Sequence, residues 1–327
     1  MVGIVSGNGL GLFNSSQDVL GLVLGQSGFG QAKGASHVNI ATGNLSIQFL
    51  DESLSGSGAD LFALRTYNSL GSLSDGDADG WRWAGERRVA LSGTVNTAGS
   101  TVTRTLGDGG QTVFNWNGSQ YVSFDSSGAH DTLVWNAGGN EWVFTQDGMG
   151  VVERYNGSTG WIKNSRDGSG AGFDYVFAGD KLTSIKDVGS GQTFEFVYGT
   201  NGKLGRLDSR TTATGALTRQ VYYEYDTYGR LQFVKTDLSP SDSSIADNSF
   251  YQTKYSYSGT TNRITRVDQS DGTFVGFVYD SVTGKIKNVM DQSGVSTFTY
   301  NSGNTTVANT AGELWTYNYD GSGRLTS

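Results

Sequence analysis

Tyr225-Asp-Thr-Tyr-Gly-Arg-Leu231 sets the pattern for the second half of this chain. An aromatic residue is followed by Asp, a short polar turn, Gly, a cation and an aliphatic residue. The order recurs in Tyr279-Asp-Ser-Val-Thr-Gly-Lys-Ile286 and Tyr319-Asp-Gly-Ser-Gly-Arg-Leu325, and without the Asp in Tyr198-Gly-Thr-Asn-Gly-Lys-Leu204. A degenerate copy runs from Tyr257 to Ile264. Such an internal repeat takes precedence over other sequence signals.

Each copy has the chemistry of a β-hairpin. Tyr ends one strand, and Asp caps the turn because its carboxylate accepts hydrogen bonds from nearby backbone N–H groups. Gly provides a residue with positive φ, and Leu or Ile begins the return strand facing inward. A hairpin of about twenty residues cannot bury its own aromatic face, so neighbouring hairpins must stack. The predicted turn and stacking residues are Tyr198, Tyr225, Asp226, Gly229, Tyr279, Asp280, Gly284, Tyr319, Asp320 and Gly323.

The rest of the chain also has the sequence pattern of β-strands. Between His37 and Phe49 the apolar residues alternate around a Thr42-Gly43-Asn44 turn, which is a hairpin signal. The 327 residues include 49 Gly, one Pro and 39 Phe, Trp or Tyr. Gly is spread along the chain, and each Gly costs a helix about 1 kcal/mol. We therefore predict an all-β protein built as one long antiparallel sheet of stacked hairpins.

The repeat resembles the YD-repeat of the Rhs family, which is shared with toxin-complex C components and teneurins. Val38-Asn-Ile-Ala-Thr-Gly-Asn-Leu45 and Leu64-Arg-Thr-Tyr-Asn-Ser-Leu-Gly71 resemble the segment that precedes the repeats in bacterial members. The resemblance covers about residues 37–327. It implies a β-sheet ribbon that spirals into a hollow shell, often around a C-terminal toxin. The family's Asp-Pro-x-Gly core motif and a distinct toxin domain are missing here, so we expect an N-terminal fragment of a longer polypeptide.

Three regions follow from these patterns. Residues 1–36 are expected to be a Gly-rich, loosely ordered leader, with a first pair of strands as the alternative. Residues 37–165 form an N-terminal β region that precedes the repeats, and residues 166–327 are the YD-repeat array, ending within a repeat. The expected function is a non-enzymatic structural module that encapsulates or presents a cargo or toxin domain on the same chain.

Charge and composition exclude several partners. The formal charge of −8, without a Lys/Arg run, argues against nucleic acid. No apolar stretch approaches the ~18 residues of a membrane span, and the absence of Cys excludes disulfides and thiolate sites. The composition is typical of exported bacterial proteins. We expect an extracellular or cell-surface location, reached by a signal that the sequence does not reveal.

One acidic loop matches a calcium-binding pattern. Asp75-Gly-Asp-Ala-Asp-Gly-Trp-Arg-Trp-Ala-Gly-Glu86 has a ligand type at every EF-hand position, namely Asp75, Asp77, Asp79, the Trp81 carbonyl and Glu86. No helices flank the loop, and an acidic surface loop is the alternative interpretation. Calcium is the one cofactor that the sequence suggests.

Evidence for catalysis is weak. The chain has two histidines, His37 and His130, but no Gly-x-Ser-x-Gly elbow that would hold a nucleophilic serine. Both histidines are expected to be surface residues. Recurring acids are expected to make turns rather than an active site, namely Asp187, Asp208, Asp226, Asp268, Asp280, Asp291 and Asp320. A glycan-cleaving enzyme is therefore the third choice.

An adhesin or carbohydrate-binding module is the main alternative function, with carbohydrate as the partner. Aromatic rings could stack on sugars, and Trp116, Trp135, Trp142 and Trp161 lie in the densest aromatic region. Their alternation with polar residues favours a sheet core instead.

Overall fold

The computed structural model describes residues 2–12, 17–18, 28–32, 34–55, 59–71, 79–124, 130–147, 150–212, 214–239 and 244–327. Within these ranges every regular element is a β-strand, so the all-β prediction is confirmed. The strands form two sheets, which we name the inner sheet (β1–β7) and the outer sheet (β8–β28).

The inner sheet has the order β2-β1-β4-β5-β6-β7, with β3 also paired to β4. Its strands are antiparallel neighbours except for the parallel pair β1 and β4. A register shift in β5 leaves Asp51 as an extra residue between Leu50 and Glu52. The strand bounds are β1 Gly3–Ser6, β2 Gln17–Asp18, β3 Gly28–Phe29, β4 Gly34–Asn39, β5 Leu45–Leu54, β6 Leu61–Asn68 and β7 Trp81–Trp83.

In the outer sheet, each of 21 strands pairs antiparallel with the next along the chain, which confirms the predicted array of hairpins. The first strand, β8, also contacts the residue just before β15, through an isolated antiparallel β-bridge between Arg88 and Trp161. The bounds of its first part are β8 Arg88–Ser92, β9 Thr101–Thr105, β10 Gln111–Trp116, β11 Tyr121–Ser123, β12 Thr132–Asn136, β13 Glu141–Thr145, β14 Val152–Asn156 and β15 Ile162–Arg166. The remaining bounds are β16 Gly172–Ala178, β17 Lys181–Asp187, β18 Thr193–Tyr198, β19 Leu204–Arg210, β20 Leu217–Tyr225, β21 Leu231–Asp237, β22 Phe250–Tyr257, β23 Ile264–Gln269, β24 Phe274–Tyr279, β25 Ile286–Asp291, β26 Gly294–Asn301, β27 Asn304–Ala308 and β28 Leu314–Asn318.

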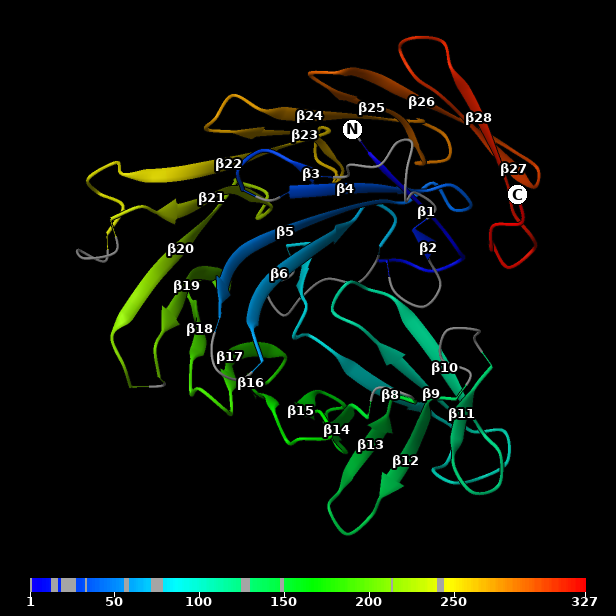
Figure 1. Cartoon of the computed structure of the whole chain (residues 1–327), viewed down its shortest axis with the longest axis vertical. Helices are drawn as coiled ribbons and strands as arrows, with labels where there is room; N and C mark the ends of the chain where they lie inside the picture. Colours follow the sequence, from blue (N-terminus) through cyan, green and yellow to red (C-terminus); the bar gives the residue numbers. More distant parts are fainter. Residues whose placement is uncertain are drawn as a thin grey trace.

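The outer sheet curves around the inner sheet. Figure 1 shows β16–β28 following an arc, with β4, β5 and β6 lying inside it. The larger hydrophobic core lies between the two sheets and joins residues such as Ile47 and Trp83 to Phe196 and Val275. A second, smaller core is enclosed by β8–β15 and includes Phe114 and Trp142.

The interior of the arc differs from the hollow shell that the resemblance implies. Large apolar side chains of the inner sheet fill the concave face of the repeats, because that face is itself aliphatic and aromatic and would otherwise be exposed to water. In the described part of the chain, the repeats therefore wrap around the inner sheet and share a hydrophobic core with it.

The expected boundaries are also corrected. Residues 3–6 were assigned to a loose leader, but they form β1, whose four residues are buried, and β4 already begins at Gly34. The alternative of early strands fits these residues better; residues 13–16, 19–27 and 33 lie outside the described ranges. The region 37–165 is split, since β4–β7 belong to the inner sheet and β8–β15 begin the outer one.

Candidate functional site

The turns that contain the Asp of the motif share one hydrogen-bonding pattern. Asp226 Oδ1 accepts hydrogen bonds from the backbone N–H groups of Tyr228 and Arg230, both at 2.9 Å. Gly229 donates its N–H to the Asp226 carbonyl at 3.0 Å and has a φ of 76°, which a residue with a side chain rarely adopts. Asp280 with Gly284, and Asp320 with Gly323, form the same kind of turn.

The carboxylates of these turns are held in their ionised form. At Asp280, the backbone N–H and then the hydroxyl of Thr283 donate hydrogen bonds that lower the pKa of the carboxyl group. A group that accepts local hydrogen bonds in this way is engaged in capping the turn. This arrangement supports the interpretation that recurring Asp residues make turns.

Two of the recurring Asp residues, Asp208 and Asp268, do not make turns as predicted. Asp208 lies within β19, where its carboxylate accepts hydrogen bonds from Arg206 and from Gln220. Asp268 lies within β23 beside Arg266. Both are cross-strand or same-strand polar partners rather than turn caps.

The repeat tyrosines connect each hairpin to the one before it. Tyr198 donates its hydroxyl hydrogen to the carbonyl of Leu182 at 3.0 Å. Tyr257 does the same to Leu231 at 2.6 Å, and Tyr279 to Ile264 at 2.9 Å. In each case the acceptor is the aliphatic residue that begins the return strand of the preceding repeat.

The cation before that aliphatic residue lies against the same tyrosine ring. Arg230, for example, lies 4.5 Å from the centroid of the Tyr257 ring. At Tyr198, Tyr257 and Tyr279, the cation and the aliphatic residue after it therefore contact the ring and the hydroxyl of the same tyrosine, through a cation–π contact and through a carbonyl. We name this set of contacts the inter-repeat ladder; its cation–ring pairs are Lys181–Tyr198, Lys203–Tyr225, Arg230–Tyr257, Arg263–Tyr279 and Lys285–Tyr300.

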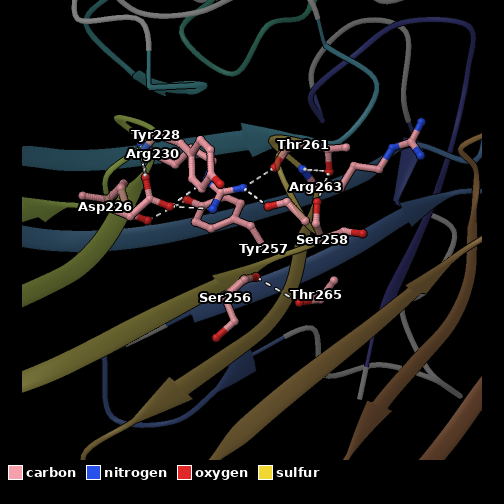
Figure 2. A network of polar contacts seen from close by, with 11 residues as sticks. Asp226, Tyr228, Arg230, Ser256, Tyr257, Ser258, Thr261, Arg263 and Thr265 are labelled. Carbon is pink, nitrogen blue, oxygen red and sulfur yellow. Dashed lines mark hydrogen bonds and ion pairs between the residues drawn. The ribbon is translucent and has the colours of Figure 1, made fainter.

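Arg230 contacts its own turn and the turn of the next repeat, as Figure 2 shows. Its Nε donates to Asp226 Oδ2 at 2.7 Å within its own turn. Its Nη1 donates to the carbonyls of Gly259 and Thr261, both at 2.7 Å, in the turn of the next repeat. One buried guanidinium group thus fixes two successive turns relative to each other.

A β-bulge recurs immediately before four of the repeat tyrosines and was not predicted. The register shifts between Glu224 and Tyr225, and equivalent shifts precede Tyr198, Tyr257 and Tyr279. The extra residue lets two aliphatic residues three apart, such as Leu231 and Val234, both face the core. The sequence signal is this spacing of three, which recurs in Leu182/Ile185, Leu204/Leu207, Leu231/Val234, Ile264/Val267 and Ile286/Val289.

A buried network of contacts around Arg65 is a second feature that the sequence did not predict. Arg65 is fully buried and pairs with Asp51, the bulged residue of β5, at 2.5 Å. Its guanidinium carbon lies 4.4 Å from the Trp81 ring centroid, and its Nη2 donates to Tyr255 Oη at 3.1 Å. Tyr223 donates its hydroxyl hydrogen to Asp51 at 2.8 Å. This network joins the inner sheet to β20 and β22 and fixes where the two sheets meet.

The calcium hypothesis falls mostly outside the described residues, because Asp75 and Asp77 lie there. Of the described residues, Asp79 is buried and accepts a hydrogen bond from the Trp81 N–H at 2.8 Å. Glu86 is buried and accepts one from the Trp83 N–H at 2.8 Å. Both carboxylates therefore cap the ends of β7, and calcium binding stays a prediction.

The candidate histidines and tryptophans range from buried to exposed. His37 is buried in β4, which corrects its assignment to the surface, whereas His130 is exposed. Trp142 and Trp161 are buried, at 4% and 6% exposure, as the sheet-core interpretation predicts. Trp116 and Trp135 are half-buried and pack against the second core.

No protein-family model matches the sequence, and no curated protein matches it. Among solved structures, a chain of the Photorhabdus luminescens Tc holotoxin pore is similar at 14% identity and a TM-score of 0.34, over 95% of this chain and 19% of that one. The TcdB2-TccC3 crystal structure is similar at 11% identity and a TM-score of 0.34, over 95% of this chain and 21% of that one.

A porin-like protein from Bacteroides uniformis is similar at 11% identity and a TM-score of 0.27, over 84% of this chain and 93% of that one. This chain spans about a fifth of the length of the two toxin-complex chains. In the described ranges, no helix is long and apolar enough to cross a membrane.

Proposed function

We propose that this chain is a non-enzymatic structural module, one section of a YD-repeat β shell that encloses or presents a cargo domain carried on the same polypeptide. The inter-repeat ladder is the observation that supports it. At Tyr198, Tyr257 and Tyr279, one repeat provides a carbonyl and a cation to the tyrosine of the next, so a hairpin array can be extended without a new kind of contact.

The position of the acids supports a structural rather than a catalytic role. The repeat carboxylates accept hydrogen bonds within their turns, and two acids with buried side chains, Glu153 and Asp51, are paired with arginines. The proposed location is extracellular or at the cell surface, after bacterial export. In this proposal the inner sheet closes one section of the shell, and the cargo lies beyond it.

Protease protection of the proposed cargo tests this function. The chain would be produced joined to the segment that follows it in its gene, and that segment would also be produced alone. The proposal predicts that the joined segment resists a protease that digests the isolated one. Equal rates of digestion, or a gene that ends with this chain, would contradict the proposal.

A further inference from the structure

A recess lined by both polar and apolar side chains lies on the last four strands. It has a volume of about 490 Å³, within the range of small-molecule sites, and Val2 covers one side of it. Aliphatic and aromatic side chains pack on the inner sheet over much of the concave face. Here the lining residues on that face are Val289, Asp291, Ser296, Asn309, Glu313 and Trp315.

Strand pairing shows that these side chains share one face. Trp315 pairs with Val307, and Ser296 pairs with Val289, and both valines are buried in the core between the sheets. Residues directly opposite each other in antiparallel strands project to the same side. Asn309 and Glu313 lie two residues from Val307 and Trp315, so they project to this side as well.

The turns hold the polar groups of the recess in place. Glu313 Oε2 accepts a hydrogen bond from Asn309 Nδ2 at 2.7 Å, and the Glu313 N–H donates to Asn309 Oδ1 at 3.0 Å. Thr310 Oγ1 accepts a hydrogen bond from the Val295 N–H at 2.6 Å, which ties this turn to β26. The recess is therefore preorganised by contacts within the protein.

Several groups in the recess have hydrogen-bonding capacity to spare. Within the described residues, no side-chain partner is found for Glu313 Oε1, for the Trp315 indole N–H or for the Ser296 hydroxyl. Asn309 has a second amide hydrogen in addition to the one given to Glu313. The free groups thus include both donors and acceptors, beside one flat apolar indole face.

We infer that this recess is a binding site for a neutral saccharide of one or two sugar rings. A sugar ring offers hydroxyl groups that both donate and accept, and an apolar C–H face that can lie against an indole. A cationic ligand would pair with the carboxylates but would offer no acceptor to the indole, amide and hydroxyl donors. An anionic sugar is disfavoured, because Asp291 and Glu313 line the recess and no Lys or Arg does.

The test is saturation-transfer NMR and titration calorimetry on the whole 327-residue chain. The probes are methyl glucoside, methyl galactoside, methyl mannoside, N-acetylglucosamine, cellobiose and lactose, with methyl glucuronide and N-acetyl-lysine methyl ester as charged comparisons. At least one neutral probe should bind with a dissociation constant on the order of 1 mM, as expected for so few ligand atoms. Methyl glucuronide should bind less tightly than methyl glucoside.

Trp315→Ala should weaken binding of that probe at least about 10-fold, and Glu313→Gln should weaken it less. Phe124→Ala, which removes an exposed aromatic ring far along the sequence, should leave binding unchanged, and melting temperatures check that each variant is folded. Trp315→Phe serves if Trp315→Ala does not fold, and it should weaken binding by removing the indole N–H. Binding of the lysine probe alone, no binding of any neutral probe, or unchanged binding in the folded Trp315 variant would overturn the inference. The shell function does not depend on this site, so either proposal can fail without the other.

Discussion

At Tyr279 the repeat motif is explained by contacts of a single side chain. Its ring lies against the Arg263 guanidinium, and its hydroxyl donates to the Ile264 carbonyl, so both neighbours belong to the preceding repeat. Burial raises the pKa of Tyr279 well above its ordinary value, and the nearby Tyr67 hydroxyl raises it further. Tyr279 is therefore a neutral hydrogen-bond donor throughout the physiological pH range.

Substitution at Tyr279 separates the two contributions. Tyr279→Phe should lower the free energy of unfolding by about 1 kcal/mol, because one hydrogen bond is lost. Tyr279→Ala should lower it by about 3 kcal/mol, because the ring contacts are lost as well. Urea denaturation measures both. Tyr228→Phe is the control, since Tyr228 is 63% exposed, and it should be near neutral; a Tyr279→Ala cost below about 1 kcal/mol would rule out the stacking role.

Glu153 makes stability depend on acid pH. Burial alone would raise its pKa, but the guanidinium groups of Arg104 and Arg87 outweigh that effect and lower the pKa from 4.5 to about 2. Because the folded-state pKa is depressed, this stabilisation is complete above about pH 4.5 and is lost as the pH falls towards 2. It amounts to roughly 3 kcal/mol.

The free energy of unfolding should therefore fall between pH 4.5 and pH 2, and Glu153→Gln should flatten that part of the profile. Urea denaturation at a series of pH values measures it. Glu195→Gln removes a partly exposed partner of Arg210 and should change stability by less than about 1 kcal/mol. An unchanged acid profile in Glu153→Gln would contradict the role given to this pair.

Calcium binding at the Asp75–Glu86 loop remains open to a direct measurement. If the loop binds calcium, excess calcium should raise the melting temperature, since a ligand of the folded state stabilises it by mass action. Asp77→Ala should abolish the increase. Calorimetry that detects no heat of binding, with the same melting temperature in both proteins, would end the hypothesis.

At the scale of the hairpin, the sequence predicts the turns more completely than the strands. Tyr, Asp and Gly identify the turns in the sequence because their roles there are local. Gly229, Gly284 and Gly323 have the positive φ that these turns require, and each donates its N–H to the carbonyl of the Asp of its turn. Strict alternation fails within the return strands, where a bulge places Leu231 and Val234 on one face. A bulge is recognised only when the partner strand is known, so the spacing of three was visible in the sequence but its meaning was not.

Two equivalent arginines test whether the ladder stabilises the array. Arg230 and Arg324 occupy the same motif position, and each pairs with the Asp of its own turn. Arg230 is buried and also binds the next turn, whereas the Arg324 side chain is 63% exposed. Arg230→Ala should cost about 3 kcal/mol, because it leaves buried carbonyls and Asp226 without their donor. Arg324→Ala should cost less than about 1 kcal/mol, and equal costs in urea denaturation would show that the cross-repeat contacts contribute nothing.

Over the whole molecule, the inner sheet meets successive repeats through polar contacts as well as through the core. Asp51 and Arg65 contact β20 and β22, the Tyr67 hydroxyl accepts a hydrogen bond from the Ile264 N–H in β23, and Thr305 in β27 donates to the Ile40 carbonyl. These contacts join residues 172 to 265 positions apart in the sequence. No local pattern reveals such distant partners, which is why the sequence indicated a hairpin array but not what fills its concave face.

The inner sheet and the repeats share one core, so we expect them to unfold as one unit. Hydrogen exchange followed by mass spectrometry in increasing urea tests it most directly. Peptides covering β5–β6 and peptides covering β20–β23 should lose protection at the same urea concentration, with the same opening free energy. If the β5–β6 peptides exchange freely while the β20–β23 peptides remain protected, the repeats form a shell that stands without its core, and the account is wrong.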